Sequence, residues 1–205
     1  MGFWIGRGRK ARRAYGLDEI ALAPGVLTVD PADVDTSWEI GGIKFPIPII
    51  AAAMDGVVDV PFAIEMGKSG GFGILNLEGV QTRYDDPSSV LKEVVESDPT
   101  GSTSVLQKVY QEPIKEELIA KRIEEIKASG EKAVVSAIPQ KAERYGQIAQ
   151  EAGVDIFVVQ STVTTVQYES KAYQTLDFKK FCQQTMKVPV IIGNTVTSEA
   201  CLELM

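Results

Sequence analysis

The chain has 205 residues, of which 44% are hydrophobic and 24% are charged, a composition typical of a folded soluble protein. It contains no histidine and only two cysteines, Cys182 and Cys201, which excludes histidine-based acid catalysis, histidine-ligated zinc and a disulfide framework within this sequence. The net charge of −7 argues against a nucleic-acid partner. No apolar run approaches the roughly 20 residues of a transmembrane helix, and the first six residues are too short an apolar segment for a secretory signal. We therefore expect a cytoplasmic protein with no membrane partner.

The first part of the chain is turn-rich and carries one basic cluster. The cluster consists of Arg7, Arg9, Lys10, Arg12 and Arg13. Such clusters are usually solvated segments, and the alternative is contact with an anionic group. Residues 37–40 and 43–45 flank Gly41-Gly42 and predict a β-hairpin, which we expect to form a collar under a sheet.

After residue 47, buried strands and amphipathic helices alternate. The predicted strands are 49–53, 72–76, 132–138, 155–160 and 188–194, and the predicted helices are 61–69, 87–96, 113–129, 140–152 and 176–185, with another helix from Ser198. We expect the helix over 113–129 to begin at Pro113, a residue favoured in the first turn. Segment 105–110 fits either a strand or a loop.

Five parallel strands with crossover helices could form an open doubly wound sheet or part of a barrel. The dinucleotide fingerprint Gly-x-Gly-x-x-Gly is absent from the first strand–helix turn, and Gly6-Arg-Gly8 does not follow a strand. The barrel is therefore favoured, and a complete one needs about 250 residues. The sequence predicts an α/β fold, a (β/α)₈ TIM barrel truncated after about five strands. Residues 1–46 are expected to form the arm and hairpin collar, and residues 47–205 the first five β/α units.

Successive strands of this predicted barrel stop at polar or flexible residues. The first ends at Met54-Asp55-Gly56, and later strands end near Gln160 and Asn194. Parallel strands share one edge at their carboxyl ends, where α/β proteins place their chemistry. We expect Met54, Gln160 and Asn194 to converge there.

A set of motifs, in order along the chain, resembles the IMP dehydrogenase/GMP reductase family. The motifs are Asp18-Glu-Ile-Ala-Leu-Ala-Pro24 with Asp33-Val-Asp35, Ala53-Met-Asp-Gly-Val57, Gly70-Gly-Phe-Gly-Ile74, Ala152-Gly-Val-Asp155 and Ile192-Gly-Asn-Thr-Val-Thr197. Residues 6–15, 77–84 and 112–115 are similar to a branch best known from cyanobacteria and actinobacteria, which lacks the CBS module usually inserted after the second strand. The stretch 78–130 between predicted strands two and three has no room for a CBS pair.

The resemblance implies a purine nucleotide site. Met54 matches the family residue that packs on the purine, although a methionine at a strand end can also be a core residue. Asp55 and Gly56 shape the same turn, and Ala52 stands where the family usually has a serine that touches the nucleotide, so that hydrogen bond is lost. Asn194 matches an asparagine beside the reacting purine, and the alternative for its amide is pairing with neighbouring backbone.

The resemblance also implies a nicotinamide cofactor. Gln160, Ser161 and Thr162 fall where typical IMP dehydrogenases have Asp-Ser-Ser at the nicotinamide riboside site. A glutamine can hydrogen-bond a ribose hydroxyl but carries no charge, so we expect cofactor geometry or affinity to differ from the common pattern.

The catalytic groups of the family do not match residues in this sequence. The family's nucleophile is a cysteine on a loop after the sixth strand. Cys182 and Cys201 do not match it and are expected to be small core residues. We expect the nucleophile, the later phosphate-binding loops, a possible monovalent-cation site and the mobile flap to lie beyond Met205, so that this chain alone is inactive.

The leading function implied is oxidation of IMP to XMP with NAD by the full-length protein. Reductive deamination of GMP with NADPH is the runner-up. A non-catalytic nucleotide-binding barrel that acts as a sensor or assembly subunit is the third possibility, because Ala52 and Gln160 depart from the usual pattern. The family's usual homotetramer is the expected assembly.

Overall fold

The computed structural model describes residues 2–98, 100–171 and 174–205, so Met1 of the predicted arm lies outside the described residues. Internal contacts divide the chain into two compact units, Met1–Asp35 and Thr36–Met205. The predicted boundary at residue 46 differs from this division, which assigns the hairpin over 37–45 to the larger unit.

The smaller unit contains a β-hairpin that the sequence analysis did not anticipate. Strands β1 (Gly2–Ile5) and β2 (Arg9–Arg12) pair antiparallel. Gly6 and Gly8 in the connecting turn have φ of +60° and +77°, values that favour glycine. Charged residues replace the usual apolar alternation in β2, which explains why the pattern was missed. Two short 3₁₀ turns, η1 (Leu17–Glu19) and η2 (Pro31–Asp33), follow.

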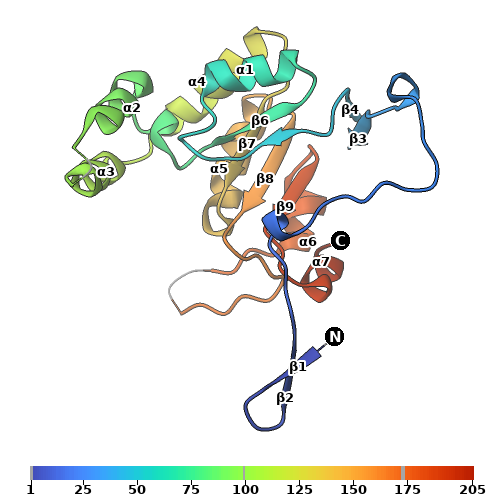
Figure 1. The fold of residues 1–205 in the computed structure, drawn as a ribbon. Coiled ribbons are helices and arrows are strands. Elements are labelled where there is room, and N and C mark those ends of the chain that lie inside the picture. The colour runs from blue at the N-terminus through green and yellow to red at the C-terminus, as the bar shows by residue number, and fades with distance from the viewer. Residues whose placement is uncertain (1, 99, 172–173) are drawn as a thin grey trace. The chain divides into compact units, whose positions relative to one another are not determined.

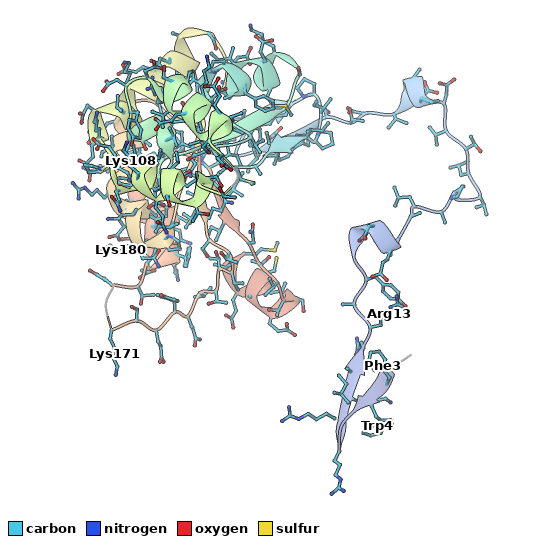
Figure 2. The ribbon with its side chains drawn as sticks, turned by 60° about the vertical axis from the view of Figure 1, so that its left-hand side comes forward. Phe3, Trp4, Arg13, Lys108, Lys171 and Lys180 are labelled. Atoms are coloured by element: carbon cyan, nitrogen blue, oxygen red, sulfur yellow. The ribbon has the colours of Figure 1, made fainter. Side chains whose placement is uncertain are left out.

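Aromatic and basic side chains share the surface of this unit. Figure 2 shows Phe3 and Trp4 on β1, and both rings are exposed. The Lys10 ammonium lies 5.9 Å from the Trp4 ring centroid, and the Arg13 guanidinium lies 4.8 Å from that of Tyr15. All five residues of the basic cluster are exposed, as a solvated segment requires.

The larger unit is built on a five-stranded parallel sheet. Its strands are β5 (Ile50–Ala51), β6 (Phe72–Asn76), β7 (Val134–Ala137), β8 (Ile156–Gln160) and β9 (Val190–Gly193), in the spatial order β5-β6-β7-β8-β9. The curled sheet has helices packed on its outer face, as Figure 1 shows. This confirms the predicted fold class, a (β/α)₈ barrel truncated after five strands.

Helices cover the outer face of the sheet. They are α1 (Val60–Lys68), α4 (Glu116–Ala128), α5 (Pro139–Glu151), α6 (Phe178–Lys180) continued by the π-helical turn η4 (Phe181–Thr185), and α7 (Ser198–Leu204). Outward residues of the strands, such as Leu75 and Phe157, are fully buried against them. Burying each such side chain contributes about 1.5–3 kcal/mol. No helix among the described residues is long and apolar enough to cross a membrane.

The inner face of the sheet is covered at its amino end by a hairpin, β3 (Trp38–Ile40) and β4 (Ile43–Phe45), as predicted from Gly41-Gly42. The rings of Trp38 and Phe45 stack with centroids 5.3 Å apart, and Phe45 lies 4.8 Å from Phe72 of β6. The Trp38 indole N–H donates to the carbonyl of Ile47 at 2.9 Å. The hairpin thus caps the apolar inner face.

Between β6 and α4 the chain forms η3 (Val80–Thr82), α2 (Pro87–Glu96) and α3 (Ser102–Gln111). Segment 105–110, predicted as strand or loop, lies within α3, so that prediction is wrong. Its β-branched residues suggested a strand, but Val105 and Val109 are one helical turn apart and Val109 is buried.

Helix α4 also starts later than predicted, at Glu116 and not at Pro113. The Lys115 N–H donates to the Thr82 carbonyl at 2.8 Å, and Lys115 keeps extended dihedrals as the N-cap.

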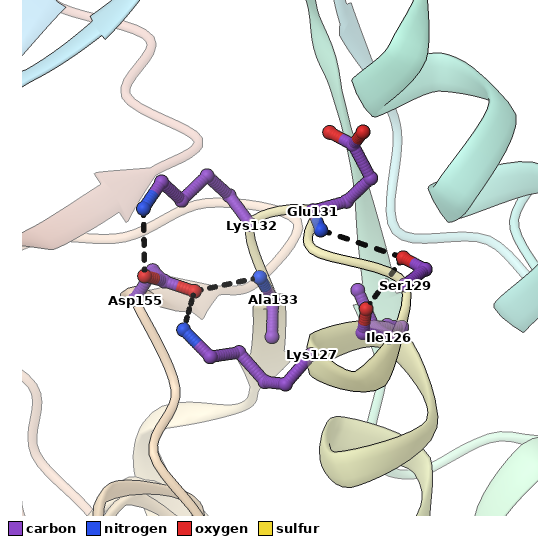
Figure 3. A network of polar contacts seen from close by, with 7 residues as sticks. All are labelled: Ile126, Lys127, Ser129, Glu131, Lys132, Ala133 and Asp155. Carbon is purple, nitrogen blue, oxygen red and sulfur yellow. Dashed lines mark hydrogen bonds and ion pairs between the residues drawn. The ribbon is translucent and has the colours of Figure 1, made fainter.

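One carboxylate fixes the amino ends of β7 and β8. Asp155 accepts hydrogen bonds from the Ala133 N–H at 2.9 Å and from Lys127 at 2.8 Å, and it pairs with Lys132 at 3.4 Å (Figure 3). Because Asp155 directly precedes β8, this network lies where the strands begin, at the end of the sheet opposite their carboxyl ends.

A buried arginine fixes the loop that leaves β6. The Arg122 guanidinium donates to the carbonyls of Gln81, Tyr84 and Asp85 at 2.9–3.0 Å. Its Nη1 atom also donates to both carboxylate oxygens of Glu125, each at 3.0 Å. The side chain of Arg122 is almost fully buried, so these carbonyls depend on it for their partners.

Replacing Arg122 with methionine in the full-length protein should lower the free energy of unfolding by about 3 kcal/mol, because three carbonyls lose charge-assisted partners. Urea denaturation followed by circular dichroism measures the loss. The matched control is Lys121→Met, an exposed position on the same helix that should change stability little. Equal effects of the two variants would contradict the role given to Arg122.

Candidate active-site cleft

An open cleft of about 610 Å³ lies at the carboxyl edge of the sheet. Its lining residues come from the ends of all five strands and from the loops that follow them. They are Ala53, Asn76, Glu78, Ser136, Ala137, Ile138, Gln140, Gln160, Ser161, Thr162 and Asn194. The volume is within the range of small-molecule sites, about 300–1,000 Å³.

The strand register explains why this edge is polar. Side chains alternate between the two faces of a strand, so Ile74 and Asn76 of β6 share the inner face. On β8, Ile156, Val158 and Gln160 follow the same alternation. The inner face is therefore apolar where the hairpin covers it and becomes polar at the carboxyl ends.

The structure brings four of the eight predicted site residues to the lining of this cleft. Gln160, Ser161, Thr162 and Asn194 line it. From the predicted Met54 turn, Ala53 is the lining residue. Ala52 and Met54 lie on either side of it in the same loop, outside the lining.

The Met54 side chain is 56% exposed in the structure of these residues. Its carbonyl accepts the N–H groups of Val57 and Val58, both at 2.9 Å, so the backbone of the turn is fixed by local hydrogen bonds. A long, unbranched thioether side chain in this position can reach over a flat apolar ring.

The ends of β8 and β9 are bonded to each other beyond the regular sheet. The Ser161 N–H donates to the Gly193 carbonyl at 2.9 Å, and the Asn194 N–H donates to the Ser161 carbonyl at 3.0 Å. The buried Thr164 hydroxyl donates to the Gly193 carbonyl at 2.8 Å and lies 2.9 Å from the Ser161 hydroxyl. The predicted purine contact and the predicted nicotinamide contact are therefore held side by side on neighbouring strands.

Asp55 is directed to a structural network and does not line the cleft. It accepts the Val80 N–H at 2.8 Å and the Asn76 amide at 3.5 Å, and the Tyr110 hydroxyl of α3 donates to it. A Cβ at Gly79 would lie 1.7 Å from the Asp55 carboxylate, so only glycine permits this approach. Asp55 joins the loops after β5 and β6 to α3, and the exposed Gly56 beside it is also outside the lining.

Tyr110 is a fixed hydrogen-bond donor in this network. Burial and the adjacent Asp55 carboxylate raise the pKa of its phenol well above the usual value, so the hydroxyl stays protonated. The Arg83 guanidinium lies 5.5 Å from the centroid of its ring. Helix α3 is thereby attached to the turn that carries Met54.

Tyr110→Phe should lower the stability of the full-length protein by about 1–2 kcal/mol, since it removes the donor that α3 offers to Asp55. Hydrogen exchange should also speed up in α3 more than in β7. Tyr168→Phe is the matched control, because Tyr168 is an exposed tyrosine on the loop after β8, away from α3. Unchanged exchange in α3 would remove Tyr110 from this role.

Glu78 is a lining residue that sequence reasoning missed. Its Oε2 accepts the Ile138 N–H at 2.9 Å. Burial raises the pKa of its carboxyl, while the backbone hydrogen bond from Ile138 and the nearby charges of Lys141 and Arg83 oppose that shift. The signal available in the sequence was the place of Glu78 two residues beyond the end of β6. Asn76, Ser136 and Gln140 were likewise not among the predicted site residues.

Neither cysteine lines the cleft. Cys182 lies in η4, half-buried against the outer core, and burial raises the pKa of its thiol. A thiol with a raised pKa is a poor nucleophile. Cys201 lies in α7 and is also half-buried.

The chemistry of the lining fits a nucleoside. Amide groups of Asn76, Gln160 and Asn194 both donate and accept hydrogen bonds, as base edges and ribose hydroxyls require. Ser136 and Thr162 add hydroxyl groups, and Ala53 adds a small apolar surface. The same groups suit the ribose of a nicotinamide cofactor as well as that of a nucleotide substrate.

Comparisons with known proteins agree on one family. A family model described as the IMP dehydrogenase / GMP reductase domain matches residues 14–205. An uncharacterized oxidoreductase of Mycolicibacterium smegmatis is 32% identical over 206 residues, covering 98% of this chain and 55% of that protein. Inosine-5'-monophosphate dehydrogenase of Methanocaldococcus jannaschii is 33% identical over 98 residues, which are 44% of this chain and 20% of that enzyme.

A solved structure shows the same similarity in three dimensions. The crystal structure of an IMP dehydrogenase/GMP reductase-like protein from Corynebacterium glutamicum matches with a TM-score of 0.91 and 33% identity. The match covers all of this chain and 54% of that one. The chain thus spans about half the length of the relatives that it matches from end to end.

Proposed function

This chain belongs to the IMP dehydrogenase/GMP reductase family, which confirms the resemblance in its motifs, and from that premise we propose that it is the first part of an oxidoreductase that converts IMP to XMP with NAD. The observation that carries the proposal is the cleft in which Gln160 and Asn194 are held on neighbouring strands. Two ligands that exchange a hydride must lie in contact, and adjacent binding residues satisfy that need.

The residues of the β5 and β9 ends are proposed to hold the purine. Asn194 offers an amide that can pair with a purine edge, and Met54, next to Ala53 in the chain, offers an apolar side chain. Ala52 supplies no hydrogen bond there, so the nucleotide depends more on the remaining contacts.

Gln160, Ser161 and Thr162 are proposed to hold the ribose next to the nicotinamide. When bound, the nicotinamide ring supplies the hydride acceptor. Gln160 orients the ribose through its neutral amide, and the Thr162 hydroxyl adds a second polar contact. The Ser161 hydroxyl bonds the Val163 carbonyl at 2.8 Å, so it shapes the loop as well as facing the cleft.

The nucleophile is proposed to come from the part of the full-length protein that follows Met205, together with the phosphate-binding loops, a monovalent-cation site and the flap. A homotetramer in the cytoplasm is proposed as its form. The family model covers IMP oxidation and GMP reduction together, so the assay must measure both.

Activity of the full-length protein should differ sharply from that of the 205-residue chain. We expect the full-length protein to reduce NAD with IMP, and we expect the isolated chain to aggregate or associate and to transfer no hydride, because β5 and β9 are unpaired edges. NADH absorbance and size-exclusion chromatography measure the two properties. Turnover only with GMP and NADPH would identify the reductase. Nucleotide binding without turnover in either direction would identify the non-catalytic barrel, and turnover by a monomeric 205-residue chain would contradict the proposal.

Gln160→Ala in the full-length protein should weaken dinucleotide binding by roughly 1–2 kcal/mol, the value of a lost hydrogen bond, and leave IMP binding nearly unchanged. Calorimetric titration with NAD and with IMP measures both. The control is Gln147→Ala, an exposed glutamine on α5. If dinucleotide affinity is unchanged in a folded Gln160→Ala protein, Gln160 is not part of the site.

A further inference from the structure

We propose that Glu78 binds the hydroxyl groups of the ribose next to the nicotinamide, opposite Gln160. This inference rests on the proposed function and adds a residue that sets the affinity and orientation of the dinucleotide. It assigns a role to the charged side chain of the cleft lining, which the proposed function has not used.

The register of the sheet places the Glu78 carboxylate beside Gln160. Ala137 of β7 pairs with Val159 of β8, and the next residues along the two strands are Ile138 and Gln160. The Glu78 carboxylate is bonded to the N–H of Ile138 at 2.9 Å. It is therefore held one strand away from Gln160, at the same level of the cleft that both residues line.

One oxygen of this carboxylate is anchored and the other is available. Oε2 takes the Ile138 N–H, whereas no residue that the structure describes donates a hydrogen bond to Oε1. Glu78 is half-buried, and Oε1 is not among the buried unpaired atoms of the described residues, so it is open to the cleft. A ligand that donates hydrogen bonds can therefore bind it without displacing a protein partner.

The charge of Glu78 selects which part of a nucleotide can lie next to it. Among the eleven lining residues it is the one carboxylate, and the others are neutral. A phosphate would be repelled, whereas the two neighbouring hydroxyl groups of a ribose donate O–H···O⁻ bonds, which are short and strong. Burial raises the pKa of the Glu78 carboxyl, and the nearby charges of Lys141 and Arg83 oppose that shift.

Glu78 and Gln160 complement each other around one ribose. A carboxylate only accepts hydrogen bonds, while the glutamine amide can both donate and accept. One hydroxyl can thus donate to Glu78 and accept from the Gln160 NH₂ group. The carboxylate supplies a charge at this level of the cleft that Gln160 lacks.

The test uses Glu78→Gln in the full-length protein. The replacement keeps the size of the side chain and an acceptor for the Ile138 N–H, and removes the charge. With XMP present to fill the purine site, so that NAD meets no hydride donor and no turnover occurs, calorimetric titration should show NAD and nicotinamide mononucleotide binding about tenfold more weakly, with AMP binding unchanged. Glu143→Gln, an exposed glutamate on α5, is the matched control and should behave as the wild type.

Thermal unfolding verifies that Glu78→Gln is folded, and Glu78→Asp provides a second variant that keeps the charge but withdraws it by one methylene. If only Glu78→Asp folds, weaker NAD binding with unchanged IMP binding supports the inference. Unchanged affinity for NAD and nicotinamide mononucleotide in either folded variant overturns it, as does equal weakening of AMP.

If the wild type oxidises IMP while these affinities stay unchanged, the inference fails alone. If the wild type binds IMP but no dinucleotide, the proposed function fails and the inference with it.

Discussion

The parallel direction of the five strands is the constraint on which the rest of the larger unit depends. Parallel strands require a crossover helix between neighbours, and those helices bury the outer face of the sheet in one apolar core. The same direction collects every strand's carboxyl end at one edge. Residues far apart in the sequence, such as Ala53 and Asn194, thereby line one cleft. The β3–β4 hairpin occupies the amino end of the inner face, so the other end is left for ligands.

A cleft of this kind needs fixed loops, and buried polar groups supply that rigidity. Arg122 satisfies three carbonyls of the loop after β6, and Asp55 connects the turns after β5 and β6 with α3. These two networks adjoin one another through η3, because Asp55 bonds Val80 and Arg122 bonds Gln81. The segment that carries Glu78 is therefore held from both sides. Such support keeps a binding group within the narrow tolerance that a ligand site requires.

The side chains that line the cleft are uncharged except for one carboxylate, that of Glu78. Amides and hydroxyls recognise bases and sugars without preference for either. The charge of Glu78, oriented by the Ile138 N–H, would repel a phosphate and accept hydrogen bonds from sugar hydroxyls. Relatives of this chain carry names of oxidoreductases and of inosine-5'-monophosphate dehydrogenase.

The sequence by itself determined the five strands, most of their helices and the strand ends that carry Gln160 and Asn194, because apolar periodicity and glycine stops are local signals. Its motifs also determined the family. Tertiary structure decided the bounds of two helices and the hydrogen-bond partners of two carboxylates, because local sequence patterns do not contain that information. Val105 to Tyr110 is helical because it packs as part of α3, and α4 starts at Glu116 because the Lys115 backbone is bonded to Thr82. The Asp55 carboxylate accepts hydrogen bonds from Val80 and Tyr110. The Glu78 carboxylate accepts one from the N–H of Ile138, sixty residues away in sequence. Such partners are set by the register of neighbouring strands and by loop packing, which depend on contacts across the whole sheet.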